Sequence, residues 1–143
     1  MYVDAQLLFS DAQAITADAS STNTIDLGAA RNIGVGQALY IHTIVDVAMT
    51  DSGSNSTLQV YLWGDSTTSF TPDDTQLLFT IPAVTAAGQK FVGRIAPGFA
   101  SNYRYIQLRY TPVNGDLSAG SFTSFVSVDS DVNTVFADGI TIT

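Results

Sequence analysis

The stretch Ala38–Thr50, ALYIHTIVDVAMT, carries the clearest structural signal in this chain. Apolar side chains that share one face of an extended chain recur here: Leu39, Ile41, Val45, Val47 and Met49. The opposite face takes the remaining alternate positions: Tyr40, His42, Asp46 and Ala48. This period of two predicts a half-buried β-strand, with only Thr43 and Ile44 out of step.

Strand patterns of the same kind recur on both sides of this stretch. They are rich in β-branched and aromatic residues, which favour strands, and they cover Ala5–Phe9, Thr22–Leu27, Thr57–Trp63, Gln76–Ile81, Lys90–Ala96, Tyr103–Thr111 and Ser121–Ser130. Turn-forming residues separate them, as at Asp51–Asn55 and at Asn114-Gly115.

No long helical period interrupts this pattern. Eight strands at even spacing predict an all-β fold, an eight-stranded jelly-roll-like antiparallel sandwich. An immunoglobulin-like sandwich is the alternative, although the chain has no cysteine pair.

Length and composition agree with one sandwich. The 143 residues fit a single domain over residues 1–143, with apolar N- and C-terminal segments. Charged residues make up only 13% of the chain, about half the usual share of roughly 25%. All 13 acidic residues are Asp, and Lys90 is the only lysine. Glu and Lys are good helix formers, so their scarcity argues against exposed helices.

The net charge of −8 limits the classes of partner. Five scattered basic residues cannot supply the basic face that nucleic acid needs, and an anionic membrane would repel the chain. We therefore expect neither nucleic acid nor membrane as a partner, and a basic protein surface fits better. There is no cysteine, no signal-peptide pattern at Met1–Asp4 and no apolar run of membrane-spanning length.

Both ends of the chain are apolar, which is unusual for termini. The residues that we predict to contact a partner protein or a neighbouring subunit are Tyr2, Leu7, Leu8 and Phe9 at the start and Val135, Phe136 and Ile140 at the end. Two interpretations are open. The ends can pack as edge strands of the same domain, or at least one can reach a neighbour, since exposed apolar patches mark interaction sites.

Catalytic and metal chemistry find little support in the sequence. His42 is the only histidine, lies mid-strand without a nucleophile motif, and is expected to face solvent or an interface. Asp51–Asn55 and Asp129–Asp131 could offer oxygens to calcium, but neither matches the EF-hand pattern, and both are expected to be Asx-turns. Asp73-Asp74 reads as solvated. We predict no enzyme, no metal site and no cofactor.

Aromatic and basic side chains on strands offer binding chemistry instead. Tyr61 and Trp63 share one strand face, and Tyr103 and Tyr105 share another. Such rings serve a core, a protein interface or a sugar site, and core or interface is favoured here. Three arginines also fall on expected strands: Arg94, Arg104 and Arg109. Their heads are expected in solvent, or paired with carboxylates across an interface.

Several segments together resemble the Bordetella-phage-type capsid cement (decoration) proteins. The segments that carry this resemblance are LLFSDAQA at 7–14, STNTIDLGAAR at 21–31 followed by Ile33-Gly34, Tyr110-Thr111, NGDLSAG at 114–120 and FADG at 136–139. The similarity runs along essentially the whole chain and is most specific in the N-terminal third.

The resemblance implies a jelly-roll protein made in the host bacterial cytoplasm and bound to the exterior of a virion. There it would bridge neighbouring subunits of the major capsid protein in an HK97-like shell. Self-association as a homo-dimer, or alternatively a trimer, is also implied. The sequence leaves a second hypothesis open, a carbohydrate-binding jelly-roll module of a phage structural protein with Tyr61 and Trp63 as its aromatic platform.

Overall fold

The computed structural model describes residues 5–99 and 102–128. After a short 3-10 turn, η1 (Ala5–Leu7), the described strands are β1 (Leu8–Ala14), β2 (Ala19–Ser20), β3 (Ile25–Asp26), β4 (Tyr40–Thr50), β5 (Thr57–Asp65), β6 (Asp74–Ile81), β7 (Lys90–Arg94), β8 (Tyr105–Val113) and β9 (Ala119–Ser127). Within these residues, no helix is long and apolar enough to cross a membrane.

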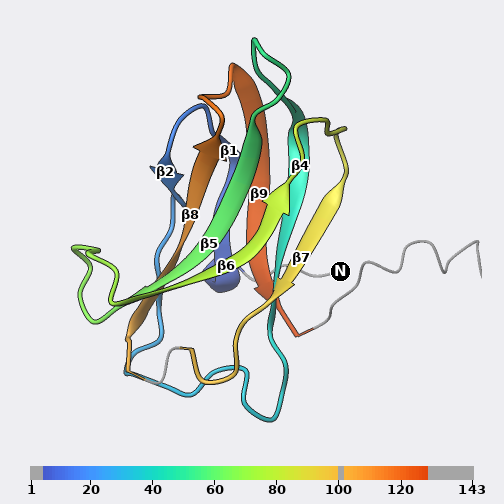
Figure 1. Ribbon diagram of the computed structural model, residues 1–143. Coiled ribbons are helices and arrows are strands. Elements are labelled where there is room, and N and C mark those ends of the chain that lie inside the picture. The colour runs from blue at the N-terminus through green and yellow to red at the C-terminus, as the bar shows by residue number, and fades with distance from the viewer. Residues whose placement is uncertain (1–4, 100–101, 129–143) are drawn as a thin grey trace, which may run out of the picture.

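The strands form two antiparallel sheets that pack face to face (Figure 1). Sheet A has the order β1-β9-β4-β7, and sheet B has the order β2-β8-β5-β6, with β3 also beside β8. Among the described strands, only the consecutive pair β5–β6 is hydrogen-bonded as a hairpin, because most other connections cross between sheets. This is the jelly-roll arrangement, so the predicted fold class is confirmed. The immunoglobulin-like alternative is wrong, since that fold pairs its first two strands and β1 and β2 lie in different sheets.

The expected count of eight strands corresponds to eight positions in the sandwich. β2 and β3 both pair with β8 and therefore occupy one interrupted position. Ser21 lies at the interruption. Its N–H donates to the Leu108 carbonyl (2.8 Å), but its hydroxyl, not its carbonyl, accepts from the Leu108 N–H (3.0 Å). A side chain that replaces a backbone acceptor in this way ends the regular ladder.

The first strand begins later than expected. We predicted a strand over Ala5–Phe9, but residues 5–7 form η1 and β1 starts at Leu8. Two register shifts interrupt the pairing of β1 with β9, and Ala12 lies in the left-handed region at a φ of 45°. Bulges of this kind twist an edge strand away from further pairing.

The core lies between the sheets. Sheet B contributes inward rows that are 0–2% exposed, namely Leu58, Val60, Leu62, Ile106, Leu108 and Tyr110. Sheet A covers them with fully buried side chains, among them Phe9, Ile41, Val45 and Phe122. Each large apolar side chain buried in this way stabilises the fold by about 1.5–3 kcal/mol.

A chain of hydroxyls crosses this core. The Tyr110 hydroxyl of β8 bonds the hydroxyls of Ser10 (2.9 Å) on β1 and Ser124 (2.8 Å) on β9, and Ser124 bonds Thr43 (2.7 Å) on β4. All four residues are 0% exposed. Thr43 broke the alternation in the sequence because its hydroxyl faces this network. Burial raises the pKa of Tyr110, so its hydroxyl stays protonated and can donate.

Val47 departs from the predicted inward face of β4. It is 54% exposed, whereas Val45 and Met49 are buried. The pairing of β4 with β9 shifts register between Val45 and Val47 and again between Val47 and Thr50. Because these irregularities change which face a side chain takes, the predicted inward position of Val47 is wrong while those of Val45 and Met49 are confirmed.

A glutamine side chain links the two sheets along each side of the sandwich. Gln76 of β6 donates to the Arg94 carbonyl (2.8 Å) and accepts from the Ala96 N–H (2.9 Å). Gln13 of β1 does the same with the Ser20 carbonyl (2.8 Å) and the Thr22 N–H (2.9 Å). Each amide thus bonds the carbonyl of one residue and the N–H of the residue two further on, as a strand neighbour would. We call these two side chains the glutamine clamps.

The Asn114-Gly115 turn is tight, as the sequence predicts, with φ values of 72° and 116°. It does not close a hairpin. It leads from β8 in sheet B towards β9 in sheet A. The dipeptide therefore supplies the sharp reversal, while the partners of the two strands are set by the packing of the sheets.

Candidate functional site

His42 is fully buried, although it lies on the face of β4 that points away from the core, and this corrects the expectation that it faces solvent or an interface. Its side chain is 0% exposed and stacks on the Phe125 ring, with centroids 5.2 Å apart and planes 9° from parallel. It sits on β4 beside Val92 of β7 and Phe125 of β9. The stacked His42 ring therefore has a packing role on the outer face of sheet A.

The Asp51–Asn55 turn is an Asx-turn, as predicted. The Asp51 carboxylate accepts hydrogen bonds from the backbone N–H groups of Ser54, Asn55 and Ser56. The Ser56 side chain first, and then these backbone N–H groups, hold the pKa of Asp51 below its usual range. Because these N–H groups already bond the carboxylate oxygens, the turn stabilises the Asp51 carboxylate itself and does not offer these oxygens to a cation. Asp129–Asp131 lies outside the described residues.

No group of three or more His, Cys, Asp or Glu side chains within residues 5–99 and 102–128 is placed to hold a metal ion. The binding chemistry of the described structure lies instead on the outer face of sheet B. β5 alternates there: Leu58, Val60 and Leu62 point to the core. Tyr61 and Trp63 therefore point away from it.

The register of sheet B places further side chains in rows with these rings. Tyr61 lies between Arg109 of β8 and Leu77 of β6. Trp63 lies between Gln107 and Thr75 in the next row. Leu77 is 47% exposed, which is unusual for a leucine on a regular strand. We call the outer surface formed by Tyr61, Trp63, Leu77, Tyr105 and Arg109 the aromatic face.

Arg109 organises the centre of the aromatic face. Its guanidinium carbon lies 5.0 Å from the centre of the Trp63 ring, within the range of a cation–π contact. The same guanidinium donates to both carboxylate oxygens of Asp18 (2.8 and 2.6 Å) and to the Ser20 hydroxyl (2.9 Å). Arg109 also lowers the pKa of Asp18. Four contacts fix this planar group, so the face is rigid where Trp63 lies.

A second pair lies near Tyr105, two rows along the sheet from Arg109. Arg104 donates to both oxygens of Asp26 (2.8 and 2.9 Å), and its guanidinium lies 5.2 Å from the Tyr105 ring centre. Arg104, followed by the Gly28 N–H, lowers the pKa of Asp26 to about 2. We expected the arginine heads in solvent, with pairing to carboxylates as the alternative. Arg104 and Arg109 instead pair with aspartates of the same chain.

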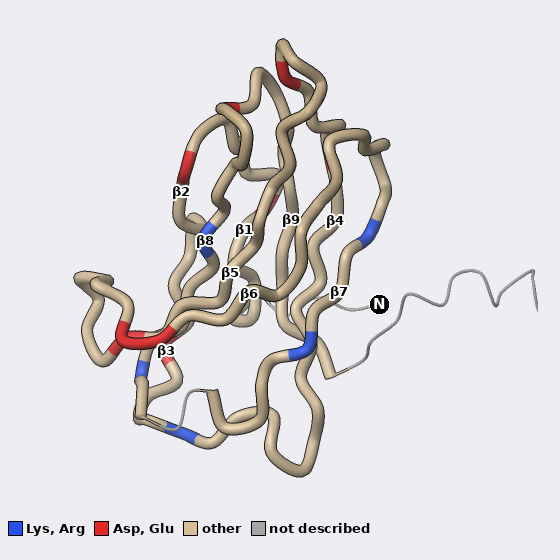
Figure 2. Tube along the Cα trace, in the orientation of Figure 1, with Lys and Arg blue, Asp and Glu red and all other residues tan. Residues whose placement is uncertain are grey.

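Negative charge without an ion-pair partner gathers at one corner of this face. Among the described aspartates, only Asp26 and Asp18 form ion pairs, with Arg104 and Arg109 respectively. Asp73 and Asp74 are exposed and follow the β5–β6 turn, in agreement with their predicted solvation. Figure 2 shows the acidic segments beside β3 and this turn. Burial, followed by the negative charges of Asp74 and Asp73, raises the pKa of Tyr103. The two aspartates therefore act electrostatically on this neighbouring tyrosine.

Asp65 lies at the same corner, opposite Tyr105 on the outer side of β5. It is only 3% exposed. One oxygen accepts from the Thr67 N–H (2.8 Å), whereas Oδ2 meets no donor among the described groups. A buried carboxylate without a compensating charge attracts a nearby cation. We call Asp65, Asp73 and Asp74 the acidic corner.

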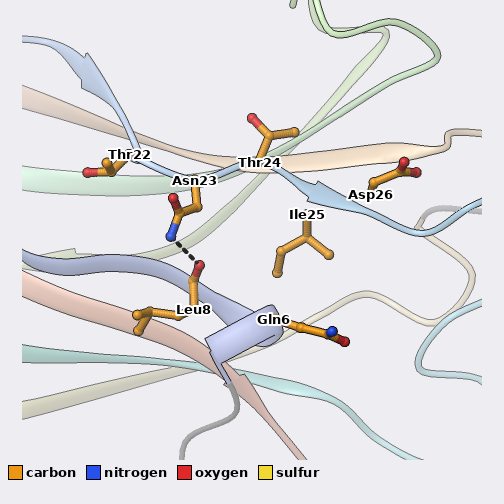
Figure 3. A pocket seen from close by; sticks show the side chains of 7 residues that line it. All are labelled: Gln6, Leu8, Thr22, Asn23, Thr24, Ile25 and Asp26. Atoms are coloured by element: carbon orange, nitrogen blue, oxygen red, sulfur yellow. Dashed lines mark hydrogen bonds between the residues drawn. The ribbon is translucent and has the colours of Figure 1, made fainter.

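A groove of about 620 Å³ runs along the edge where β1 meets β3 (Figure 3). Its lining side chains are Gln6, Leu8, Thr22, Asn23, Thr24, Ile25 and Asp26. Asn23 spans it by donating to the Leu8 carbonyl (3.1 Å) from its side chain and to the Phe9 carbonyl (2.9 Å) from its backbone. The lining is mainly polar, and the charged group on it, Asp26, is bound by Arg104.

Three of the predicted contact residues are described. Leu7 is 38% exposed and Leu8 is partly buried beside the groove, so both can reach a neighbour. Phe9 is 0% exposed within the core, which corrects its assignment as a contact residue, because its ring packs inside its own sandwich. Tyr2, Val135, Phe136 and Ile140 lie outside the described residues.

The sequence pointed to Tyr61 and Trp63 but missed Leu77 and the role of Arg109. Leu77 fell in an expected strand that reads as continuously apolar, LLF at 77–79. A register shift between Val60 and Tyr61 in the pairing with β6 turns Leu77 outward, opposite Tyr61, and no sequence pattern marks that shift.

These features define a class: an all-β jelly-roll domain whose outer sheet face presents fixed aromatic and arginine side chains beside an acidic corner. The Bbp16 family model matches residues 9–126, which extend from the first described strand to the last. The chain therefore belongs to the Bbp16 family, a family of Bordetella phage proteins. The all-β sandwich fits a phage structural protein. No curated protein matches the chain.

Proposed function

We propose that this protein is a capsid cement (decoration) protein that binds the outside of an HK97-like shell and bridges neighbouring major capsid subunits. Membership of the Bbp16 family over residues 9–126 is the observation that carries this proposal. The sandwich is closed on both sides by the glutamine clamps, and the bulged edge of β1 resists strand addition. We therefore expect the domain to bind a partner through its sheet faces and its chain ends, and not by adding a strand at a sheet edge.

Bridging would stabilise the shell by adding buried surface across subunit boundaries. A specific contact buries about 1,200–2,000 Å² in total, and many copies on one shell act together. Each bridging contact must break before the joined subunits separate. The net charge of −8 favours a basic partner surface.

Co-sedimentation with shells that lack this protein tests the proposal. The protein is mixed with empty shells over a range of concentrations, pelleted and quantified. A saturable bound amount in a simple ratio to the major capsid protein, with a higher melting temperature of the shell, is the expected result. Absence of binding at micromolar concentration contradicts the proposal. Light scattering of the free protein tests the homo-dimer, with a trimer as the alternative.

The terminal contact is a separate part of this proposal. Removing residues 1–11 would also delete part of β1 and the buried Phe9 ring, so that deletion damages the fold. Leu7→Ser is a cleaner change because the side chain is 38% exposed. If Leu7 contacts the shell, this variant binds more weakly at an unchanged melting temperature. Equal binding by this variant and the original chain would remove Leu7 from the contact.

A carbohydrate-binding module of a phage structural protein is the second candidate function. The observation in its favour is that Tyr61 and Trp63 lie two residues apart on an outer sheet face. Against it, Arg109 already lies over the Trp63 ring. A glycan array combined with Trp63 fluorescence tests this candidate, and sugar-dependent changes in emission would support it over shell binding.

A further inference from the structure

We propose that the aromatic face of sheet B is the docking surface for the shell, and that it receives a capsid-protein surface with an apolar centre and lysine or arginine side chains at its rim. This inference rests on the proposed cement function and names the surface and the chemistry of the partner. It is argued from the composition of the face, its size and its charge.

The composition is that of the centre of a protein interface. Such centres are enriched in Tyr, Trp and Arg and depleted of charge that is not paired. Tyr61, Trp63 and Tyr105 are partly buried already, so fixing them on binding costs little conformational freedom. The guanidinium of Arg109 is held by Asp18 and lies over Trp63 before any partner arrives. Leu77, at 47% exposed, is the aliphatic side chain of this face, and covering it removes apolar surface from water.

The face is large enough to form the central part of a specific contact. Sheet B is four strand positions wide, and β5 is 9 residues long. At about 4.8 Å between strands and about 3.3 Å per residue, the face measures roughly 19 by 30 Å, or about 570 Å² in plan. Projecting aromatic and arginine side chains raise the accessible area above that. A standard interface needs about 800 Å² from each partner.

The charge around the face selects the partner. Asp18 and Asp26 flank it with side chains that are 53% and 45% exposed, although each is paired with an arginine. The acidic corner borders it through Asp74, which lies opposite Gly64 and next to the Trp63 row. Asp65 lies just below the surface at this corner, and its Oδ2 meets no donor among the described groups. Basic side chains on the partner would complement this rim and speed encounter.

The chain provides its own reporter for the test. Trp63 is the only tryptophan, and it lies at the centre of the proposed contact. Titration with empty shells should shift its emission to shorter wavelength as water leaves the ring. Leu77→Asp should weaken binding at least about tenfold, because it replaces the exposed apolar side chain of the face with a charge that the apolar centre of the partner would have to desolvate. The matched control is Val84→Asp, at an 81% exposed position on the β6–β7 connection, which should bind as the original chain does.

The rim is tested separately with the double variant Asp73→Asn and Asp74→Asn. A basic partner predicts about 3–10-fold weaker binding for this variant and a smaller dependence on salt. Binding is compared only among variants whose melting temperature equals that of the original chain.

The outcomes separate the two proposals. If the original chain binds shells and Leu77→Asp binds equally well, the docking surface is wrong and the cement function stands. If the double Asn variant keeps the full affinity and salt dependence, the basic rim is wrong. If the original chain does not bind shells, both proposals fall, and a Trp63 response to sugars alone would assign the face to carbohydrate.

Discussion

Replacing the glutamine clamps should loosen the two sides of the sandwich to different extents. Gln76→Ala removes two hydrogen bonds, to the Arg94 carbonyl and from the Ala96 N–H. Arg94 and Ala96 are both exposed, so water can form hydrogen bonds with the freed carbonyl and N–H groups. At about 0.5–1.5 kcal/mol for each net hydrogen bond, we expect a loss of about 1 kcal/mol in the free energy of unfolding.

Gln13→Ala should cost more. Its amide bonds the Ser20 carbonyl and the Thr22 N–H, and its oxygen also accepts from the Ser10 hydroxyl (2.7 Å). Ser10 is 0% exposed, so water cannot reach it without local opening. Three bonds with one buried partner correspond to about 2–3 kcal/mol. For a chain of 143 residues, that lowers the melting temperature by about 6–12 °C.

Urea unfolding and amide hydrogen exchange together measure this effect. The control is Gln37→Ala, at an exposed loop position where the side chain makes only one long contact of 3.4 Å to the neighbouring carbonyl. It should cost less than about 0.5 kcal/mol. In the clamp variants, the amides of Thr22 and Ala96 should lose protection selectively. If Gln13→Ala is as stable as Gln37→Ala and the Thr22 amide stays protected, the clamp interpretation is refuted.

Three further predictions concern other parts of the sandwich. Tyr110→Phe should lower the free energy of unfolding by about 1–2 kcal/mol in urea, because the buried hydroxyls of Ser10 and Ser124 lose a partner; an unchanged midpoint would contradict the network. Gly93→Ala should cost about 1–3 kcal/mol, since the new Cβ would lie 2.9 Å from the Leu78 Cβ, and a neutral result would mean that β6 and β7 can separate. The pKa of Asp26 falls from 3.8 to about 2 on folding, so its ionised form stabilises the fold above about pH 4, and this contribution is lost as pH falls towards 2. Asp26→Asn should therefore make acid unfolding less steep between pH 4 and 2, and an unchanged acid profile would contradict the Arg104 pair.

The fold could be predicted from the sequence because alternation survives where two central strands pair with each other in a regular register. β5 and β8 show this best, with Leu62 beside Leu108 and Val60 beside Tyr110 on the same inward face of sheet B. The scarcity of helix-forming charged residues excluded the alternative fold classes. Strand ends were less predictable, because β1 and β6 begin where turns and bulges permit pairing.

The candidate site could be predicted only in part. Tyr61 and Trp63 share a face by spacing alone, which the sequence shows directly. Leu77 could not be placed, because its direction depends on a register shift between two strands. The partner of Arg109, Asp18, lies 91 positions away, and such contacts follow from topology and not from local pattern. His42 was misjudged for a similar reason, since its burial depends on the strands beside it.

Cryo-electron microscopy of a decorated shell tests the central claim most directly. A reconstruction that resolves side chains would locate this domain relative to the capsid subunits beneath it. We predict capsid-protein density against Tyr61, Trp63 and Leu77, with basic side chains near Asp73 and Asp74. A reconstruction in which this face of sheet B points to solvent, with the shell bound elsewhere, would contradict the account.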